Sequence, residues 1–419
     1  GLGDVYKRQT LASDITVDAD ANNTSVTFNS TATVNSDSTG TKRDLTINTG
    51  AGAVAMQGII GGSVALDAIS INAATAGAGT VEVANIAGAA GAVSIGNGAT
   101  ATLTLDGTTY TSTGAQTYEA NDINITAGAD VTFTTTNTAV EFQDGAAGQI
   151  VLSDATDLTI TSRGGNLTIA PPFSGTDSGG GGNPAEDITL NAAGGTVTLS
   201  NTGAAVLATE IGDVTLTGAT IALSNSITST GTNSAGNAAT IDINGAVTLN
   251  DNDITFTTGG AGIDFSSTIV SGSTTPRALT IAQGAGAVVI NGNIGGTANN
   301  DVGNITIGAT GNNGNITLSG DIGTDSVAGA AVVALGNAST GLITLGGAEY
   351  NTSGTQTYTA DDYNLNGTAI TLTTSNDIVT FNDGGGDGSI DLADAAALTI
   401  GTIGGNIVVN VPILSLIHI

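Results

Sequence analysis

Residues 43–62 read RDLTINTGAGAVAMQGIIGG, and the stretch returns at residues 277–296 as RALTIAQGAGAVVINGNIGG, with thirteen of the twenty positions identical. Two further matches follow: residues 110–118 (YTSTGAQTY) match residues 350–358 (YNTSGTQTY), and residues 157–169 match residues 397–409. The offsets of 234, 240 and 240 residues indicate that one long unit has been duplicated. A repeat of this length decides the architecture, because each copy must build the same structure.

Short runs of alternating apolar and small polar residues recur along both copies. Examples are LTIN at residues 45–48, VTFTT at 131–135 and DITLN at 187–191. Each run has the pattern of a strand with one buried face, and clusters of Gly, Asn and Asp separate the runs. No helical periodicity of useful length is present, so the sequence predicts an all-β protein.

Two all-β architectures fit these strands. In a parallel β-solenoid (a β-helix) each strand stacks on its equivalent in the next coil, here about 20 residues later, around a thin interior of small and aliphatic residues. Tandem antiparallel β-sandwich domains are the alternative, and their thicker cores usually contain many aromatic residues. The aromatic content of 3% and the absence of Trp favour the solenoid. Asn-Gly and Asp-Gly pairs, such as residues 97–98 and 106–107, are typical of hairpins and favour the sandwich.

The repeat divides the chain into a first copy at residues 10–170, an intervening segment at 171–246 and a second copy at 247–413. The intervening segment begins with PPFSGTDSGGGGNP, which has the composition of a loop or an insertion.

The two ends of the chain share nothing with the repetitive body. DNA strings encoding residues 4–9 (DVYKRQ) and 414–419 (LSLIHI) can be written as reverse complements of each other. Inverted adapters from transposase-based sequencing libraries have this property. We therefore expect residues 1–9 and 414–419 to be adapter-derived, the single histidine His418 among them, and the chain to be a metagenomic fragment. The apolar last residues are then no membrane segment, and they are too short to span a bilayer.

The formal net charge of −30 limits the partners of the chain. Such an acidic protein repels phosphate backbones and anionic membrane surfaces, so we expect neither nucleic-acid binding nor membrane insertion. It attracts divalent cations instead. The absence of cysteine excludes disulfides and thiol chemistry, and it fits a large secreted bacterial protein.

Few residues could support catalysis. No nucleophile elbow, phosphate loop or metal-ligand cluster is present. A carboxylate pair could hydrolyse glycosides, but Glu119 and Glu141 align with Thr359 and Thr380 in the second copy. We therefore expect a solvated surface rather than an active site.

Arg43 and Arg277 occupy the same position in both copies, at the entry to a strand, whereas Arg163 aligns with Ile403. The repeated pair could bind the carboxylates of an acidic polysaccharide. The simpler interpretation, which we favour, is a contact with a neighbouring aspartate or with a strand-end carbonyl.

The remaining patterned side chains are tyrosines and threonines. Tyr110 and Tyr118, with their counterparts Tyr350 and Tyr358, would stack on sugar rings if exposed, but packing between coils is the favoured interpretation. The Thr-x-Thr runs suggest ice binding. Threonine is nonetheless common in strands for its β-propensity alone, and the runs are spaced too irregularly to predict a flat array.

Calcium is the one ligand that the sequence suggests, and no other cofactor is expected. NDGGGDGSIDLAD at residues 382–394 places Asp383, Asp387 and Asp391 on glycine-rich turns, and hard cations prefer carboxylate oxygens. The aligned residues 143–154 lack an equivalent of Asp387. Ordinary turn chemistry, which we favour, explains the same acids.

The YTSTGAQTY phrase, the strands that follow it and residues 26–54 resemble the long repeats of giant bacterial surface proteins of the filamentous-haemagglutinin-like, β-strand-repeat adhesin type. The resemblance covers nearly the whole repetitive body. It implies export to the bacterial cell surface, an extracellular location and a stalk without catalytic motifs. Its implied partners are host or environmental glycans, or cell surfaces, besides the neighbouring coils of the same polypeptide.

We therefore expect a structural stalk or adhesion segment that is not an enzyme. A carbohydrate-active β-solenoid enzyme is one alternative, and it would need a cleft that holds two acids. A calcium-stiffened surface-layer-like protein is another, and it would assemble into sheets when calcium is added.

Overall fold

The computed structural model describes residues 9–74, 77, 79–146, 148–153, 156–176, 186–200, 211–233, 235–296, 301–308, 311, 314–323, 330–392 and 397–415. Strands contain 52% of the protein and helix 1%, and parallel stacked coils form a β-solenoid of about 14 turns. The predicted solenoid is therefore confirmed. Most of the two ends predicted to be adapter-derived, with His418, lie outside the described residues.

Contacts divide the chain into two compact units. Unit 1 contains residues 1–211, 217–219 and 233–236, and unit 2 contains residues 212–216, 220–232 and 237–419. The long strand β24 (Ile211–Leu223) is shared between them. The repeat boundaries predicted from the sequence stay a prediction, because they follow similarity rather than contacts.

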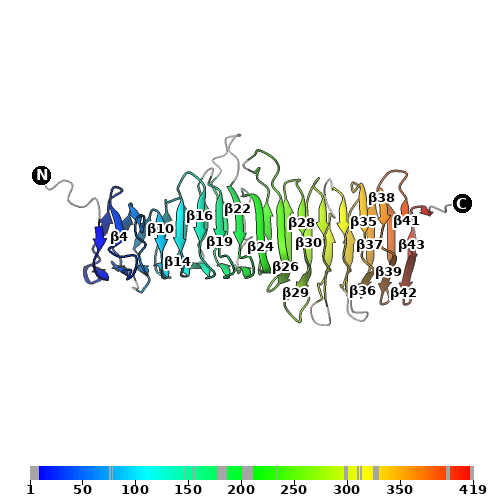
Figure 1. Ribbon diagram of the computed structural model, residues 1–419. Coiled ribbons are helices and arrows are strands. Elements are labelled where there is room, and N and C mark those ends of the chain that lie inside the picture. The colour runs from blue at the N-terminus through cyan, green and yellow to red at the C-terminus, as the bar shows by residue number, and fades with distance from the viewer. Residues whose placement is uncertain are drawn as a thin grey trace. The chain divides into compact units, whose positions relative to one another are not determined.

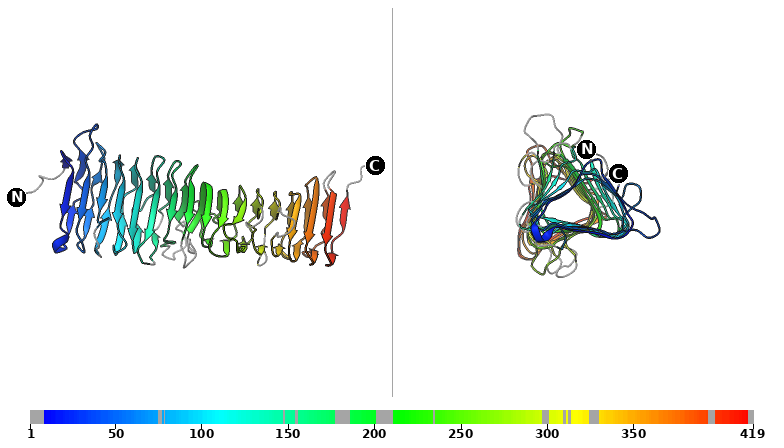
Figure 2. Two further views of the ribbon diagram at one scale, coloured as in Figure 1. Left: turned by 90° about the horizontal axis from the view of Figure 1, so that it is seen from below. Right: turned by 90° about the vertical axis from the view of Figure 1, so that its left-hand side faces the viewer.

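Three stacks of parallel strands form the coils of unit 1, and the blue and cyan coils outline a triangle in the end-on view of Figure 2. Stack 1 consists of β1 (Gln9–Leu11), β4 (Thr33–Ser36), β7 (Ile59–Ile60), β10 (Ile86–Ala89), β13 (Thr109–Ser112), β16 (Val131–Thr134), β19 (Leu158–Thr161) and β22 (Glu186–Asn191). Stack 2 consists of β2 (Ile15–Asp18), β5 (Leu45–Asn48), β8 (Ile69–Ile71), β11 (Val93–Gly96), β14 (Gln116–Ala120), β17 (Val140–Asp144), β20 (Leu167–Ile169) and β23 (Thr196–Leu199). Stack 3 consists of β3 (Val26–Phe28), β6 (Val54–Met56), β9 (Thr80–Val83), β12 (Thr102–Leu105), β15 (Asp122–Ile125), β18 (Ile150–Leu152) and β21 (Phe173–Gly175). A single 3-10 turn, η1 (Asp20–Asn22), follows β2.

Unit 2 repeats this arrangement, and Figure 1 shows its strands side by side in yellow to red. Its stack 1 consists of β29 (Ile269–Ser271), β36 (Glu349–Thr352), β39 (Ala369–Thr374) and β42 (Ala397–Thr402), with single bridges at Ile294 and Ile322 between the first two. Its stack 2 consists of β25 (Ile227–Ser229), β27 (Ile254–Thr258), β30 (Leu279–Ala282), β32 (Ile305–Ile307), β34 (Val333–Leu335), β37 (Gln356–Ala360), β40 (Val379–Asp383) and β43 (Ile407–Val409). Its stack 3 consists of β26 (Ile241–Leu249), β28 (Ile263–Phe265), β31 (Val288–Ile290), β33 (Ile316–Leu318), β35 (Leu342–Leu345), β38 (Asp362–Leu365), β41 (Ile390–Leu392) and β44 (Ile413–Ser415).

The two copies of the repeat form matching strands. β5 and β30 carry the two LTI runs, and β14 and β37 carry the two QTY runs. Strand pairs within the stacks are parallel, as in β5 on β8 and β37 on β40, which excludes the antiparallel sandwich.

Coil length varies more than the sequence suggests. Register partners are 20 residues apart for Leu103 and Ile123 and 30 residues apart for Leu158 and Ile188. The predicted length of about 20 is therefore the lower end. Asn97 and Gly98 link β11 to β12, which belong to different stacks, so this pair forms a corner rather than a hairpin.

The interior consists of columns of apolar side chains from successive coils. Leu45 and Ile47 alternate with half-buried polar neighbours, as the period-2 pattern predicts. The segment predicted as a loop after residue 170 instead begins with β21, whose Phe173 is buried. An aromatic side chain at the first apolar position of this strand explains why it packs inward.

Acidic and amide side chains at the corners connect one coil to the next. The Asp14 Oδ1 atom accepts a hydrogen bond from the Asp44 amide at 3.1 Å, and Asp44 Oδ1 accepts one from the Ala68 amide at 2.9 Å. Asn85 Oδ1 accepts from the Thr108 and Thr109 amides, both at 2.9 Å. These contacts pair turn amides that no strand ladder reaches, so many of the acids have a structural role.

Candidate functional site

The four patterned tyrosines lie in the core. Tyr110, Tyr118, Tyr350 and Tyr358 are each 0% exposed. In unit 1 the Tyr110 ring stacks on Phe133, with centroids 4.6 Å apart and planes 9° from parallel. Stacking on sugar rings is therefore excluded, and the packing interpretation is confirmed.

A buried glutamine connects the tyrosines of unit 1. Gln116 is 0% exposed, and its Nε2 atom donates to the Tyr110 carbonyl oxygen at 3.0 Å, to Ser112 Oγ at 3.1 Å and to the Thr134 carbonyl oxygen at 3.1 Å. The Tyr118 hydroxyl donates to Gln116 Oε1 at 3.1 Å. The amide thus joins three successive strands of the stack, β13, β14 and β16.

Unit 2 contains the same network around Gln356. Its Nε2 atom donates to the Tyr350 carbonyl oxygen at 2.7 Å, to Thr352 Oγ1 at 3.2 Å and to the Thr373 carbonyl oxygen at 2.9 Å, and the Tyr358 hydroxyl donates to its Oε1 atom at 3.0 Å. Burial raises the pKa of Tyr118 and of Tyr358. Both hydroxyls therefore remain protonated and act as donors.

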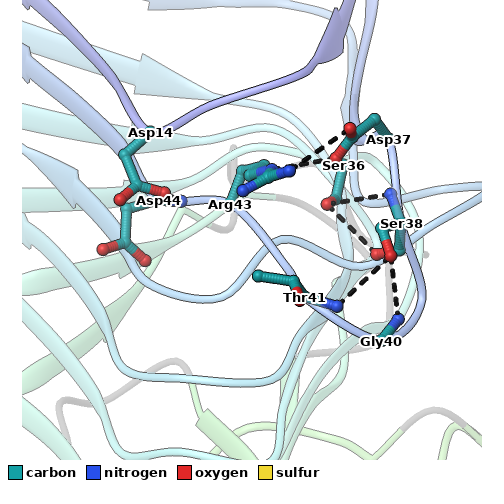
Figure 3. Close-up of polar contacts among 8 residues, drawn as sticks. All are labelled: Asp14, Ser36, Asp37, Ser38, Gly40, Thr41, Arg43 and Asp44. Atoms are coloured by element: carbon teal, nitrogen blue, oxygen red, sulfur yellow. Dashed lines mark hydrogen bonds and ion pairs between the residues drawn. The ribbon is translucent and has the colours of Figure 1, made fainter.

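Arg43 lies on the surface of unit 1 and pairs with a nearby aspartate. Its Nε atom lies 2.9 Å from Asp37 Oδ1, and Nη2 lies 3.3 Å from Oδ2 (Figure 3). The hydrogen bond from Arg43 lowers the pKa of Asp37. Because the fork of the guanidinium is already occupied, the favoured interpretation of Arg43 is confirmed.

Arg277 makes the other predicted kind of contact. Its Nε atom donates to the Asn250 carbonyl oxygen at 3.3 Å. Arg163 lies on a turn with a φ of 48° and is exposed. The repeated arginines therefore share a position but differ in their partners.

The structure does not pair the two glutamates considered for catalysis. Glu119 lies in register with Gln143, and Glu141 lies in register with Thr117. Gln143 Nε2 donates to Glu141 Oε2 at 2.9 Å. All of these side chains point outward from stack 2, as expected for a solvated surface.

Sequence reasoning missed two other acid pairs. Asp242 of β26 lies in register with Asp264 of β28, and both are half-buried. Partial desolvation, with the Asp264 charge as a further cause, raises the pKa of Asp242. Desolvation and the charge of Glu82 likewise raise the pKa of Asp106. The repeated I-D-x patterns are a signal of the first pair, but only the register brings them together.

Replacing Asp242 by asparagine is expected to stabilise unit 2 at pH 7. A carboxyl whose pKa is raised by folding contributes most below its unfolded value of 3.8, and this contribution is lost as the pH rises through the folded value. Removing the charge should therefore raise the free energy of unfolding by about 0.2–1 kcal/mol at pH 7, and by less at pH 3. Thermal unfolding at both values measures this, and the exposed Asp130→Asn variant is the control. A gain that is equal at pH 3 and pH 7 would contradict it.

The calcium candidates lie on and after β40 and β41. Asp383, Asp387 and Asp391 are exposed, and Asp383 Oδ1 accepts hydrogen bonds from the Gly385 and Gly386 amides at 3.0 and 3.2 Å. Asp394 of the same stretch lies outside the described residues. Across the described part of the chain, no group of three or more His, Cys, Asp or Glu side chains is placed to hold a metal ion.

The calcium site stays a prediction with a direct test. Binding predicts that calcium raises the melting temperature, by the equivalent of about 2.7 kcal/mol at one hundred times the dissociation constant, and that Asp387→Asn removes this rise. Magnesium is the matched control ion. An unchanged melting temperature in millimolar calcium would refute the site.

Threonines form aligned columns on the outer face of stack 1 in unit 1. The irregular sequence spacing was expected to prevent a flat array, and this expectation is wrong, because the loops absorb the differences in length. The first column consists of Thr109, Thr132, Thr159 and Thr189. The second column consists of Thr111, Thr134, Thr161 and Asn191.

None of the helical residues that the structure describes belongs to a helix long and apolar enough to cross a membrane. No protein-family model matches the chain, and searches of curated proteins and of solved structures return no match. The described geometry therefore supports one conclusion at this level, which is that the chain is a duplicated parallel β-solenoid.

Proposed function

We propose that this chain is a non-catalytic structural segment of a large exported bacterial surface protein. One observation carries the proposal: the two copies retain the same interior and differ on the outside. The Gln116 network recurs around Gln356 with the same donors and acceptors. Glu119 and Glu141 on the outer face are replaced by Thr359 and Thr380.

Such a pattern fits a segment whose role is to continue the stack. Catalysis requires reacting side chains at fixed positions on the surface, whereas a stack requires only that each coil matches its neighbours. The retained groups are buried and bonded to strands of adjacent coils, as expected for the second role.

Export and an extracellular location are part of the proposal, and so is adhesion to glycans or cell surfaces. They rest on the resemblance of the repeats to those of filamentous-haemagglutinin-like adhesins. The acidic charge and the absence of cysteine agree with this location. The stacked coils themselves supply the neighbouring-coil contacts that the proposal needs.

The enzyme alternative predicts release of reducing ends from polysaccharides. The full chain should be incubated with neutral and acidic polysaccharides, and reducing ends should be measured against a buffer control. We expect no release. Release that Asp106→Asn or Glu82→Gln abolishes, without loss of folding by circular dichroism, would assign catalysis to that acid pair and overturn the proposal.

A further inference from the structure

The outer face of stack 1 in unit 1 presents a two-dimensional array rather than a single row. Four consecutive strands, β13, β16, β19 and β22, each contribute two outward positions, and seven of the eight are threonine. All eight side chains are half-buried. Neighbouring positions lie about 4.8 Å apart between strands and about 6.7 Å apart along a strand, by the geometry of β-sheets.

The array is held rigidly from below. Between the two columns lie inward side chains that are 0–1% exposed: Tyr110, Phe133, Ile160 and Leu190. β16 and β19 are hydrogen-bonded to a parallel strand on each side. Threonine is branched at Cβ and has few χ1 rotamers in a strand. Methyl and hydroxyl groups are therefore repeated at the same intervals from coil to coil.

Charged side chains border the array but do not interrupt it. Asp130, Asp157 and Asp187 precede the strands β16, β19 and β22 at one edge. Between that edge and the far end of each strand, the outward positions carry a hydroxyl or an amide. Water above such a face meets regularly placed methyl groups and hydrogen-bonding groups, and ordered water on proteins is held by groups of this kind.

The second copy provides an internal comparison. In unit 2 the equivalent strands β36, β39 and β42 present Glu349 and Asn351, then Thr371 and Thr373, then Thr399 and Gly401. A carboxylate, an amide and a glycine thus interrupt the columns that are nearly complete in unit 1. The two faces share a backbone arrangement but differ in regularity.

We propose that the threonine array of unit 1 binds ice. The intervals between its hydroxyl groups are close to those between oxygen atoms in one plane of hexagonal ice, so water ordered over the array can join the ice lattice. A free sugar or a flexible polysaccharide offers no such extended repeat, and the face has no aromatic ring on which a sugar could stack. The binding surface is distinct from the structural role proposed above and does not depend on it.

The test measures capture of the fluorescently labelled full chain by a growing ice hemisphere, together with thermal hysteresis. Thr132→Lys/Thr159→Lys places two long cations in the centre of the array. Thr371→Lys/Thr399→Lys makes the same change at the aligned positions of unit 2. Circular dichroism near 0 °C checks that each variant retains its strands.

We expect the wild-type chain to enter ice and shape it, the unit 1 variant to lose both properties, and the unit 2 variant to retain them. Thr132→Ser/Thr159→Ser, which removes only two methyl groups, should weaken capture without abolishing it. Exclusion of the wild-type chain from ice would overturn the proposal. Equal loss in the two lysine variants would also overturn it, because the effect would then follow charge rather than the array.

Discussion

Replacing Gln116 by leucine is expected to destabilise the coils around β14 by about 3 kcal/mol, because a buried polar group without a partner costs about 1–3 kcal/mol. The leucine removes three hydrogen bonds from Nε2 and one to Oε1. It leaves the Tyr118 hydroxyl and the Thr134 carbonyl without these partners in a site that is closed to solvent. The volume of the side chain changes little, so the loss is mainly one of hydrogen bonding.

Tyr118→Phe provides the matched control for this prediction. It removes a single hydroxyl and should cost about 1 kcal/mol. Because that hydroxyl needs no partner once it is gone, the double variant should be less destabilised than the sum of the single variants. Gln143→Leu, on the outer face of the same stack, should have little effect.

Hydrogen exchange is the preferred measurement, since a stack of coils can open locally rather than all at once. Amides of β13, β14 and β16 should lose protection in Gln116→Leu, whereas those of β37 in unit 2 should not. Unchanged protection in β14 would show that the network contributes little.

Much of the fold follows from the sequence, because burial in a strand depends on alternation alone. Leu45 and Ile47 are buried where the LTIN pattern places them, and Tyr110 is in the core as its position in a T-Y-T run implies. The duplication adds a second, independent reading of the same pattern. Together they predict the strands, their inward faces and the parallel stack.

Register is what the sequence could not supply. Thr134 and Thr161 are 27 residues apart and Thr161 and Asn191 are 30 apart, yet all three share one column. The differences lie in loops, which change length without altering the strands. A prediction from spacing along the chain therefore missed both this array and the pairing of Asp242 with Asp264.

The partners of surface groups are also set by their surroundings rather than by their own pattern. Arg43 meets Asp37, six residues earlier, while Arg277 meets the carbonyl of Asn250 in the preceding coil. Alignment identified the position of both arginines. It could not identify the contacts, since the residues before the two copies differ.

Replacing Gly148 by alanine is expected to have the largest effect of any single methyl group in unit 1. A Cβ at this position would overlap the carbonyl oxygen of Asn121 in the preceding coil. Backbone, unlike the end of a side chain, cannot move aside without breaking the β15 to β18 ladder. Overpacking of this kind costs about 1–3 kcal/mol, and occasionally more, and we expect the upper end of that range.

The duplication makes the same prediction in unit 2. Gly388 aligns with Gly148, and its added Cβ would overlap the carbonyl oxygen of Asp361. Gly388→Ala should therefore remove protection from hydrogen exchange in β38 and β41, as Gly148→Ala does in β15 and β18. Gly194→Ala is the control, because an added Cβ there meets nothing within 4 Å.

The two alanine variants also test whether coils behave as nearest neighbours. If each coil depends only on the coils it touches, the lost protection should fade within one or two coils of the substitution. Loss of protection along a whole unit would instead show that the unit unfolds as one cooperative body. Wild-type protection in both variants would mean that the corner can open without disturbing the strands, and that close approach of the two backbones is not what holds successive coils in register.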